Sequence, residues 1–486
     1  PESFYAEIAA NEKQVKEWIA LGFIESDTNI TADYLKGNPY LLVDTELFES
    51  EFKQKLLVEI QDLDEMTDGL LVQSDNFHAL NLLQDRYREQ VKCVYIDPPY
   101  NAKSSEILYK NTFKDSSWLT MMDNKLDIAK QFQSFDSVFV VAIDEVEQEV
   151  LGRVLSQHYP EHEKSCIAVN HNPSGQQGDN FSFCHEYSYF VYPKPGRYIG
   201  EQMRENEKDW DERNFRDVTG DDSLRTAGPN CFYPIYIKPS PNSLGEIVGF
   251  GDICEDGFHP QINESMENGL IAIYPIDPEG IERKWRFARN TVDSISSELK
   301  LHYLKKRDVY DIKRLKKKFN FKSNWVDSRY SANNHGTQLL NKIIPKAAAS
   351  YPKSLYTVID ALVAGLNDST DALVMDYFAG SGTTGHAVLN LNRQDNGQRK
   401  YVLVEMGDHF KTVLKPRIKK ITFSEEWKGG KPIAKLDENY KGISHCFKTL
   451  RLESYEDVMD NLKLQRSDQQ EDALSKPENK ALKEDY

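Results

Sequence analysis

Apolar positions along the chain change their spacing several times, and these changes predict an alternation of strands and helices. Short apolar runs without alternation predict buried strands, and apolar residues at helical spacing predict the helices between them. The predicted strands are 70–72, 91–96, 137–143 and 187–192, and the predicted helices are 77–83, 118–132 and 146–155. Strands that alternate with helices are typical of parallel sheets built from βαβ units.

This alternation stops near residue 195 and resumes near residue 336. The segment between is rich in turn residues (PKPGRY, KPSPNS, DPEG), which predicts an inserted domain. After it we predict helices at 353–366 and 386–391 and strands at 372–377 and 400–404. The predicted fold class is therefore α/β, a doubly wound, mostly parallel sheet interrupted by one insertion.

The predicted organisation has five parts. A helical extension comes first, with helical spacing at 10–21 and 46–66, and a polar tail comes last. The predicted parts are a helical extension at 1–66, one half of the α/β domain at 67–194, the insertion at 195–335, the second half at 336–425, and a C-terminal segment with its tail at 426–486.

Composition places the chain among soluble, multi-domain proteins of the cytoplasm. Its 486 residues are enough for two to four domains, and aromatic residues at 11% exclude wholesale disorder. The six cysteines are scattered without a C-x-x-C pair, which predicts neither disulfides nor a metal site. Apolar runs are too short to span a membrane. A net charge of −17 would argue against nucleic-acid binding if the charges were evenly distributed along the chain, and here they are not.

The strongest chemical signal is Asp97-Pro98-Pro99-Tyr100, directly after a predicted buried strand. Ligands of open α/β sheets bind beyond the carboxyl ends of strands, so this position delivers Asp97 into a cleft. Two successive prolines fix the backbone and remove two donors, and an aromatic ring follows. The group suits a planar ligand that bears an amino substituent, although an Asp-Pro turn at a strand end is an alternative.

A second signal lies in Asp376-Tyr377-Phe378-Ala379-Gly380-Ser381-Gly382-Thr383-Thr384-Gly385, between a predicted strand and helix. Its glycines satisfy G-x-G-x-x-G, which lets the backbone approach a ligand at a helix N-terminus. Glu405 closes the next strand, where an acid binds a ribose diol. This pattern predicts a nucleoside-containing cofactor and does not separate NAD from S-adenosylmethionine. A tight turn without a ligand is the alternative.

Two further features give weaker signals, and only the first is predicted to share the sheet edge of Asp97. Asp75 follows the first strand, and taken alone it suits a helix N-cap better than a ligand. His185, Glu186 and Tyr187 form a polar cluster before another strand. Because His185 has no second ligand at metal spacing, the cluster predicts polar residues at a strand edge and no metal site.

These motifs, taken together, resemble the β-class amino-methyltransferases of DNA, in which the catalytic motif precedes the cofactor motif. More specifically, the sequence is similar to the methylation (Mod) subunit of type III restriction–modification systems. The supporting stretches are VYIDPPYNAKSSEILYKNTF, SWLTMM, VVAIDEVEQ, HEYSYFVYPKP, MDYFAGSGTTGHAV, YVLVEM and FKTLRLESYEDVMDNL. The resemblance covers most of residues 70–462.

The resemblance implies a site-specific DNA methyltransferase that uses S-adenosylmethionine and flips an adenine out of the duplex. It assigns the target base to Asp97, Pro98, Pro99 and Tyr100, and the cofactor to Asp75, Asp376, Phe378, Gly380, Gly382, Thr383 and Glu405. Pro352-Lys353 matches a further cofactor-side motif, which usually reads K-P. It also implies double-stranded DNA as substrate, a homodimer, a possible restriction subunit, and no metal or membrane.

A basic stretch at 305–322 lies in the insertion and carries nine basic residues against Asp308 and Asp311. With aromatic residues interleaved (Tyr303, Tyr310, Phe319, Phe321, Trp325), it predicts contacts to DNA phosphates, which set register rather than sequence. A solvated charged face is the alternative. The predicted DNA-binding residues are Lys305, Lys306, Arg307, Lys313, Arg314, Lys316, Lys317 and Lys318.

Three other functions fit part of the sequence. An NAD(P)-dependent oxidoreductase explains G-x-G-x-x-G and Glu405 but has no use for Asp97-Pro98-Pro99-Tyr100. A non-catalytic recognition subunit explains the basic insertion, although none of the motif residues has been lost. A methyltransferase of the same fold that acts on N4 of cytosine or on RNA differs only in its substrate.

Overall fold

The computed structural model describes residues 2–100, 114–177, 180–204, 208, 210–240, 243–347, 352–433 and 441–453. The chain forms two compact units, which we describe separately. Unit 1 comprises residues 1–200 and 322–486, and unit 2 is the inserted segment Glu201–Phe321. The predicted insertion, 195–335, is longer than unit 2 at both ends. At the C-terminal end this is because Asn324–Trp325 (β17) pairs with the large sheet of unit 1. Part of the predicted C-terminal segment, 454–486, lies outside the described residues.

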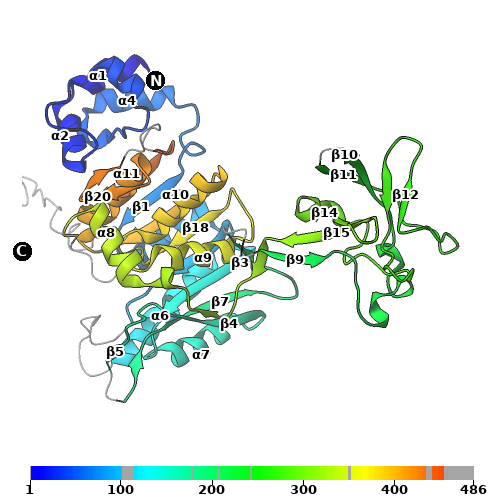
Figure 1. Cartoon of the computed structure of the whole chain (residues 1–486). Helices are drawn as coiled ribbons and strands as arrows, with labels where there is room; N and C mark the ends of the chain where they lie inside the picture. The colour runs from blue at the N-terminus through cyan, green and yellow to red at the C-terminus, as the bar shows by residue number, and fades with distance from the viewer. Residues whose placement is uncertain are drawn as a thin grey trace, which may run out of the picture. The chain divides into compact units, whose positions relative to one another are not determined.

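Unit 1 is built on a nine-stranded sheet in the order β17-β4-β7-β3-β2-β18-β19-β1-β22 (Figure 1). All of its neighbouring strands pair in parallel except those on either side of β7. The predicted mostly parallel sheet is thereby confirmed. Its strands are β1 (Gly69–Gln73), β2 (Val91–Ile96), β3 (Gln133–Ile143), β4 (His162–Val169), β7 (Glu186–Pro193), β17, β18 (Leu373–Asp376), β19 (Lys400–Glu405) and β22 (Phe447–Arg451).

The reversed direction of β7 decides which residues meet at the functional edge of the sheet. In register, Tyr187 of β7 lies opposite Ile143 at the end of β3. Glu186, the first residue of β7, lies opposite Val169 at the end of β4. The start of β7 therefore reaches the same edge as the carboxyl ends of its parallel neighbours.

Helices cover both faces of this sheet. On one side α5, α6 and α7 pack against each other, and α9 and α10 do so on the other, where α9 contacts β2 and β3. The helices of unit 1 are α1 (Tyr5–Ala10), α2 (Glu12–Leu21), α3 (Ala32–Gly37), α4 (Ser50–Glu59), α5 (Asn76–Tyr87), α6 (Lys114–Lys130), α7 (Gln148–His158), α8 (Gln338–Ile343), α9 (Leu355–Leu366), α10 (Thr383–Asp395) and α11 (Lys415–Phe423). The predicted helices are confirmed with shifted ends, except that the helical spacing at 46–66 yields only α4 (Ser50–Glu59) as an α-helix.

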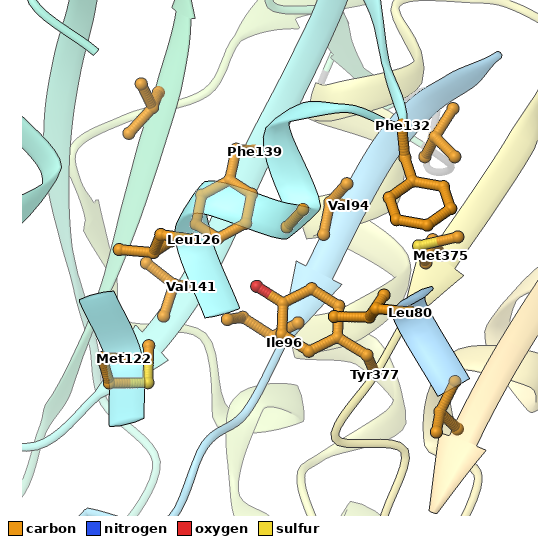
Figure 2. Close-up of a cluster of buried hydrophobic side chains, with 14 of the residues drawn as sticks. Leu80, Val94, Ile96, Met122, Leu126, Phe132, Phe139, Val141, Met375 and Tyr377 are labelled. Carbon is orange, nitrogen blue, oxygen red and sulfur yellow. The ribbon is translucent and has the colours of Figure 1, made fainter. Parts of the chain in front are cut away.

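An extensive apolar core of unit 1 lies between the sheet and the α5–α7 layer. Val94 and Ile96 of β2 point into it with Met375 of β18, while Leu80 comes from α5 and Met122 from α6 (Figure 2). On the opposite face, a Cβ added at Gly365 would lie 2.6 Å from the Cys93 sulfur. This glycine therefore lets α9 approach the sheet closely. Because β2 is buried on both faces, its sequence VKCVYI is apolar except for Lys92 near its start.

The N-terminal helices pack onto the C-terminal part of unit 1. The Lys419 ammonium lies 2.6 Å from the Asp44 carboxylate and also contacts Glu17. The rings of Phe23 and Phe423 stack at 4.3 Å. The predicted helical extension is thus part of the same compact unit. Across the described ranges, no helix has the length and apolar character that a bilayer span requires.

Unit 2 is built from small antiparallel sheets around its own apolar core, which includes Tyr233, Trp285 and Ile312. One sheet has the order β11-β10-β13-β12 and another β14-β15-β9. Their strands are β9 (Asp211–Asn214), β10 (Ile235–Ser240), β11 (Ser243–Phe250), β12 (Asn263–Ser265), β13 (Ile271–Ile273), β14 (Leu299–Leu304) and β15 (Val309–Lys316). The basic stretch is therefore largely a strand, and the predicted change from parallel α/β to irregular β structure is confirmed.

Candidate active site

The two strongest motifs leave the sheet side by side. Strand β18 pairs in parallel with β2 on one side and with β19 on the other. Asp97 follows β2, the glycine-rich turn follows β18, and Glu405 ends β19. Residues far apart in the sequence thus meet at one edge, as the carboxyl ends of neighbouring parallel strands must.

Four polar side chains meet beyond β2, and we call Asp97, Tyr100, Glu186 and Lys353 the base-side cluster. The Lys353 ammonium lies 2.7 Å from Glu186 Oε2 and 3.2 Å from Asp97 Oδ1. It also donates to the Tyr100 hydroxyl and lies 4.5 Å from the centre of that ring. The Tyr100 hydroxyl lies 3.3 Å from Glu186 Oε2. One cation therefore joins two carboxylates and the motif tyrosine.

Burial and charge act together on the cluster. Burial raises the pKa of Asp97, and Glu186 adds to this effect while Lys353 opposes it. Burial alone would lower the pKa of Lys353, but Asp97 and Glu186 raise it above its ordinary value. Lys353 therefore stays charged, and Asp97 binds a proton more readily than an exposed aspartate does.

The second motif proline, Pro99, is held by a neighbouring helix. The Trp118 indole nitrogen of α6 donates to the Pro99 carbonyl at 2.6 Å, and Trp118 is fully buried. This bond fixes the loop that carries Asp97 and Tyr100. Of the predicted catalytic residues, the structure brings the side chains of Asp97 and Tyr100 together and gives Pro99 a role in holding the loop.

The glycine-rich turn enters α10 through two glycines with positive φ, Gly380 at 51° and Gly382 at 81°. Side chains with a Cβ rarely adopt this conformation. Asp376 accepts hydrogen bonds from Phe378 N at 3.0 Å and from Thr384 Oγ1 at 2.5 Å, and it is 2% exposed. Both of its oxygens are used inside the turn, so Asp376 shapes the turn.

Glu405 connects the turn to the end of β19. Its carboxylate accepts the Gly380 and Gly407 N–H groups, each at 2.8 Å. Burial would raise the pKa of Glu405, but hydrogen bonds from His409, Gly407 and Gly380 outweigh burial and hold the pKa below its ordinary value. Glu405 is therefore an anion, and a carboxylate has further lone pairs to accept hydroxyl groups.

These residues fit a nucleoside-containing cofactor. A Cβ added at Gly380 would meet, within 4 Å, only the Phe378 carbonyl oxygen at 3.9 Å among the described atoms. The space beside the turn is thus open, and the Glu405 carboxylate lies at its edge. S-adenosylmethionine carries a ribose diol that such an acid binds.

A buried arginine fixes the glycine-rich turn through hydrogen bonds. Arg417 of α11 donates to Ser381 Oγ at 2.9 Å, to Thr383 Oγ1 at 3.0 Å and to His386 Nδ1 at 3.2 Å. It is fully buried, and burial lowers its pKa to about 9. Thr383, predicted at the cofactor, therefore has its hydroxyl engaged with Arg417.

Asp75 is the N-cap of α5, as its sequence context predicts. Its carboxylate accepts the backbone N–H groups of Phe77 at 3.0 Å and His78 at 3.2 Å and contacts the His78 ring. Burial would raise the pKa of Asp75, but the bonds from His78 and Phe77 hold it below its ordinary value. The carboxylate lies at the end of β1, on the same edge as Glu405.

The predicted DNA-binding residues lie in unit 2, and several are paired with acids there. Lys313 contacts Glu212 at 2.5 Å, and Arg314 contacts Glu298 at 2.7 Å. The other paired or stacked residues are Arg307 with Glu279, Lys316 with Phe319, and Lys317 with Trp210. Lys305 and Lys306 are exposed in the turn between β14 and β15. Trp325, predicted to belong with this stretch, is instead buried against Tyr330 in unit 1.

Sequence reasoning gave Glu186 no functional role, and it did not predict Arg417. Glu186 resembles a polar strand-edge residue until β7 is known to run antiparallel. Arg417 lies in a helix whose lysines and arginines look solvated in the sequence, yet it is fully buried. The family motif at Pro352-Lys353 indicated that Lys353 belongs to the site. The motif did not predict the contact between Lys353 and Asp97.

Comparisons with known proteins agree with this geometry. The family model described as DNA methylase (N6_N4_Mtase) matches residues 91–416. The methyltransferase M.KpnI of Klebsiella pneumoniae is 27% identical over 384 residues, which cover 73% of this chain and 84% of the relative. The type III EcoPI Mod subunit of Escherichia phage P1 is 27% identical over 400 residues, covering 71% of this chain and 58% of the relative.

Another relative, the EcoP15I Mod subunit of Escherichia coli, is 23% identical over 395 residues, covering 72% of this chain and 60% of the relative. The chain thus spans less than two thirds of these two Mod subunits. Similar solved structures include the M1.HpyAVI–SAM complex, with 11% identity and a TM-score of 0.33 over 72% of this chain and 98% of that one. The cytosine-N4-specific PvuII DNA methyltransferase has 12% identity and a TM-score of 0.34 over 73% and 86%.

The family model covers more than half of the chain and spans both motifs, from β2 to the start of α11. The order of the motifs, their position on neighbouring strands and the open cofactor turn agree with that match. The chain belongs to the DNA methylase family, enzymes that transfer a methyl group from S-adenosylmethionine to DNA.

Proposed function

We propose that this protein methylates the N6 amine of a flipped-out adenine in double-stranded DNA, as the modification component of a restriction–modification system. The observation that carries this proposal is the position of Asp97 and Tyr100 beside the glycine-rich turn, on adjacent strands. An aspartate in the first position of this motif is, in the family that the sequence resembles, more often a mark of adenine than of cytosine. N4-methylation of cytosine is the second candidate.

On the base side, the exocyclic amine of the target adenine is a poor nucleophile, because its lone pair is delocalised into the ring. The residues on this side therefore have to activate it. Hydrogen bonds from the amine to Asp97 and to the Pro98 carbonyl favour a pyramidal nitrogen with a localised lone pair. Asp97, whose pKa burial raises, is also suited to accept the proton that the methylated amine loses. Tyr100 offers a ring on which an extruded base stacks, because an amine within the duplex cannot reach this site.

On the cofactor side, Glu405 would hold the ribose hydroxyls, and Phe378, Gly380 and Gly382 would line the bound molecule. Asp75 would accept a hydrogen bond from the adenine amino group of the cofactor. Asp376 and Thr383 fix the turn. S-adenosylmethionine, when bound, supplies a methyl group on a sulfonium, which is already a strong electrophile. The remaining acceleration comes from holding the amine in line with that methyl group.

Unit 2 is the proposed target-recognition domain. Its exposed lysines would contact phosphates, which position the protein without reading bases. The relatives named as Mod subunits of type III restriction–modification enzymes support a restriction subunit as a partner. A homodimer is proposed from the family resemblance alone. Both partners belong to this proposal.

The test is mass spectrometry of nucleosides from unmethylated phage DNA incubated with the protein and S-adenosylmethionine. We expect N6-methyladenine with the wild type and a loss of at least about 100-fold in rate with Asp97→Ala, since a positioned acid–base group contributes about 10²–10⁴-fold. N4-methylcytosine would overturn the base assignment and keep the chemistry. No modified base on DNA of mixed sequence would contradict the proposal.

The control for folding is cofactor binding. Asp97→Ala leaves Glu405 and the turn intact, so S-adenosylmethionine should raise the melting temperature of the variant as it raises that of the wild type. NAD raising the melting temperature while S-adenosylmethionine does not would contradict the cofactor assignment.

A further inference from the structure

Glu186 is a buried carboxylate that the mechanism above does not use. It is 3% exposed, and its Oε2 lies within hydrogen-bond distance of Lys353 and Tyr100. Its other oxygen, Oε1, is buried with no hydrogen-bond partner in the described part of the chain. A carboxylate kept only to stabilise the fold would be expected to have both oxygens satisfied, because an unpaired buried acceptor is destabilising.

Glu186 and Asp97 compete for the same ammonium group. Lys353 Nζ is 2.7 Å from Glu186 Oε2 and 3.2 Å from Asp97 Oδ1. An ammonium has three N–H donors, so the Tyr100 hydroxyl, Glu186 and Asp97 can each accept one, and the two carboxylates compete for closeness to the charge. The shorter distance shows that Lys353 is held closer to Glu186 than to Asp97.

The competition matters because Asp97 must accept hydrogen bonds from the target amine. A lysine ammonium that closed fully on Asp97 would occupy its lone pairs and stabilise its charge, making it a weaker acceptor. We propose that Glu186 is a positioning residue for methyl transfer, which draws the Lys353 ammonium away from Asp97 and leaves Asp97 able to bind the amine. This inference rests on the proposed function, since it assigns the amine to Asp97.

Other ionisable groups surround the cluster and will titrate with it. Asp144, at the end of β3, has its pKa raised by burial to about 6. His171, after β4, has its pKa lowered by burial, and its Nδ1 is buried without a partner among the described residues. Asp376 of the turn adds to this set, and burial raises its pKa to about 7. The contribution of Glu186 to a pH profile can therefore be read only from the difference between the profile of the wild type and that of its Glu186 variant.

The experiment is a double-mutant cycle on methyl transfer to unmethylated phage DNA at pH 8.5, with Glu186→Gln, Lys353→Met and the double variant. We expect Glu186→Gln to lower kcat at least tenfold, with KM for S-adenosylmethionine within about twofold of the wild type, because the lysine then closes on Asp97. Adding Lys353→Met should restore kcat at least threefold over Glu186→Gln, since no cation is left to cover Asp97. If Glu186 had only a structural role, the losses in kcat of the two single variants would add in the double variant, or the double variant would be less active still.

Two outcomes overturn the inference: kcat of Glu186→Gln within threefold of the wild type, or a double variant no more active than Glu186→Gln. Glu186→Asp keeps the charge and should retain more activity than Glu186→Gln. A variant that fails to fold would show no cooperative melting transition. Glu186→Asp then carries the test, because its shorter carboxylate should weaken the hold on Lys353 and give an intermediate kcat, while an unchanged kcat overturns the inference.

A second measurement separates failure of this inference from failure of the proposed function. The carboxyl resonance of ¹³C-labelled Asp97, identified by difference from Asp97→Asn, reports its titration without any DNA substrate. Removing Glu186 should lower the midpoint for Asp97 by at least one pH unit, because the raising effect of Glu186 is removed and Lys353 pairs with Asp97 alone. An unchanged midpoint overturns the inference, whereas an inactive wild type with a lowered midpoint overturns only the proposed function.

Discussion

Two buried cations support the two sides of this active site, and they are stabilised in different ways. Lys353, on the base side, lies between the carboxylates of Asp97 and Glu186. Arg417, beneath the cofactor turn, is held by Ser381, Thr383 and His386, and no carboxylate of the described residues lies within ion-pair distance of it.

The difference between them appears in their protonation. Burial acts against both charges, yet the pKa of Lys353 is raised by its two carboxylates while the pKa of Arg417 falls to about 9. Both stay protonated at neutral pH. Lys353 is therefore a charge that balances other charges, and Arg417 is a set of hydrogen-bond donors that fixes a loop.

The largest effect on stability is expected for Lys353→Met. This change leaves Asp97 and Glu186 buried together without a cation, and breaking a buried pair costs about 3–5 kcal/mol. Without the ammonium the raised pKa of Asp97 rises further, so the loss should grow as pH increases above the unfolded value near 4. Urea unfolding at pH 5 and pH 8 checks this, and a loss that is larger at pH 5 would contradict it.

Arg417→Met should have a smaller effect on stability, about 1–3 kcal/mol, because the absent hydrogen bonds are partly offset by removal of an uncompensated buried charge. Its main effect should fall on the cofactor turn, with KM for S-adenosylmethionine rising about tenfold and kcat changing less. Steady-state kinetics with varied cofactor measures both constants. A stability loss equal to that of Lys353→Met would remove the distinction between the two cations.

The smallest effect on stability is expected for exposed cations, Lys305→Ala with Lys306→Ala, whose combined change should lie within about 0.5 kcal/mol. These lysines should instead matter for DNA, and the slope of log affinity against log salt should become shallower by about 0.9 for each phosphate that the variant no longer neutralises. The matched control is Lys313→Ala with Arg314→Ala, whose charges are already paired with Glu212 and Glu298. A slope that changes only in the control would refute this assignment.

The cofactor turn was largely predictable because its signal is local. The glycines, the following helix and the acid at the end of the next strand lie within one βαβ unit, and the structure places them as the pattern requires. The hydrogen-bond partners of the side chains in the turn were not predictable, because they depend on residues that become neighbours only in the folded structure. Both oxygens of Asp376 are used inside the turn, and the Thr383 hydroxyl is engaged by Arg417.

By itself, the sequence determined the fold class, the two motifs and the position of each motif after a buried strand, because these follow from periodicity and from residues close together along the chain. Only the tertiary structure decided the composition of the base-side cluster. Glu186 joins it because β7 runs antiparallel, and Lys353 joins it from the loop before α9. Charges that compensate each other across segments distant in sequence are set by strand order and burial, and neither has a signature in local sequence.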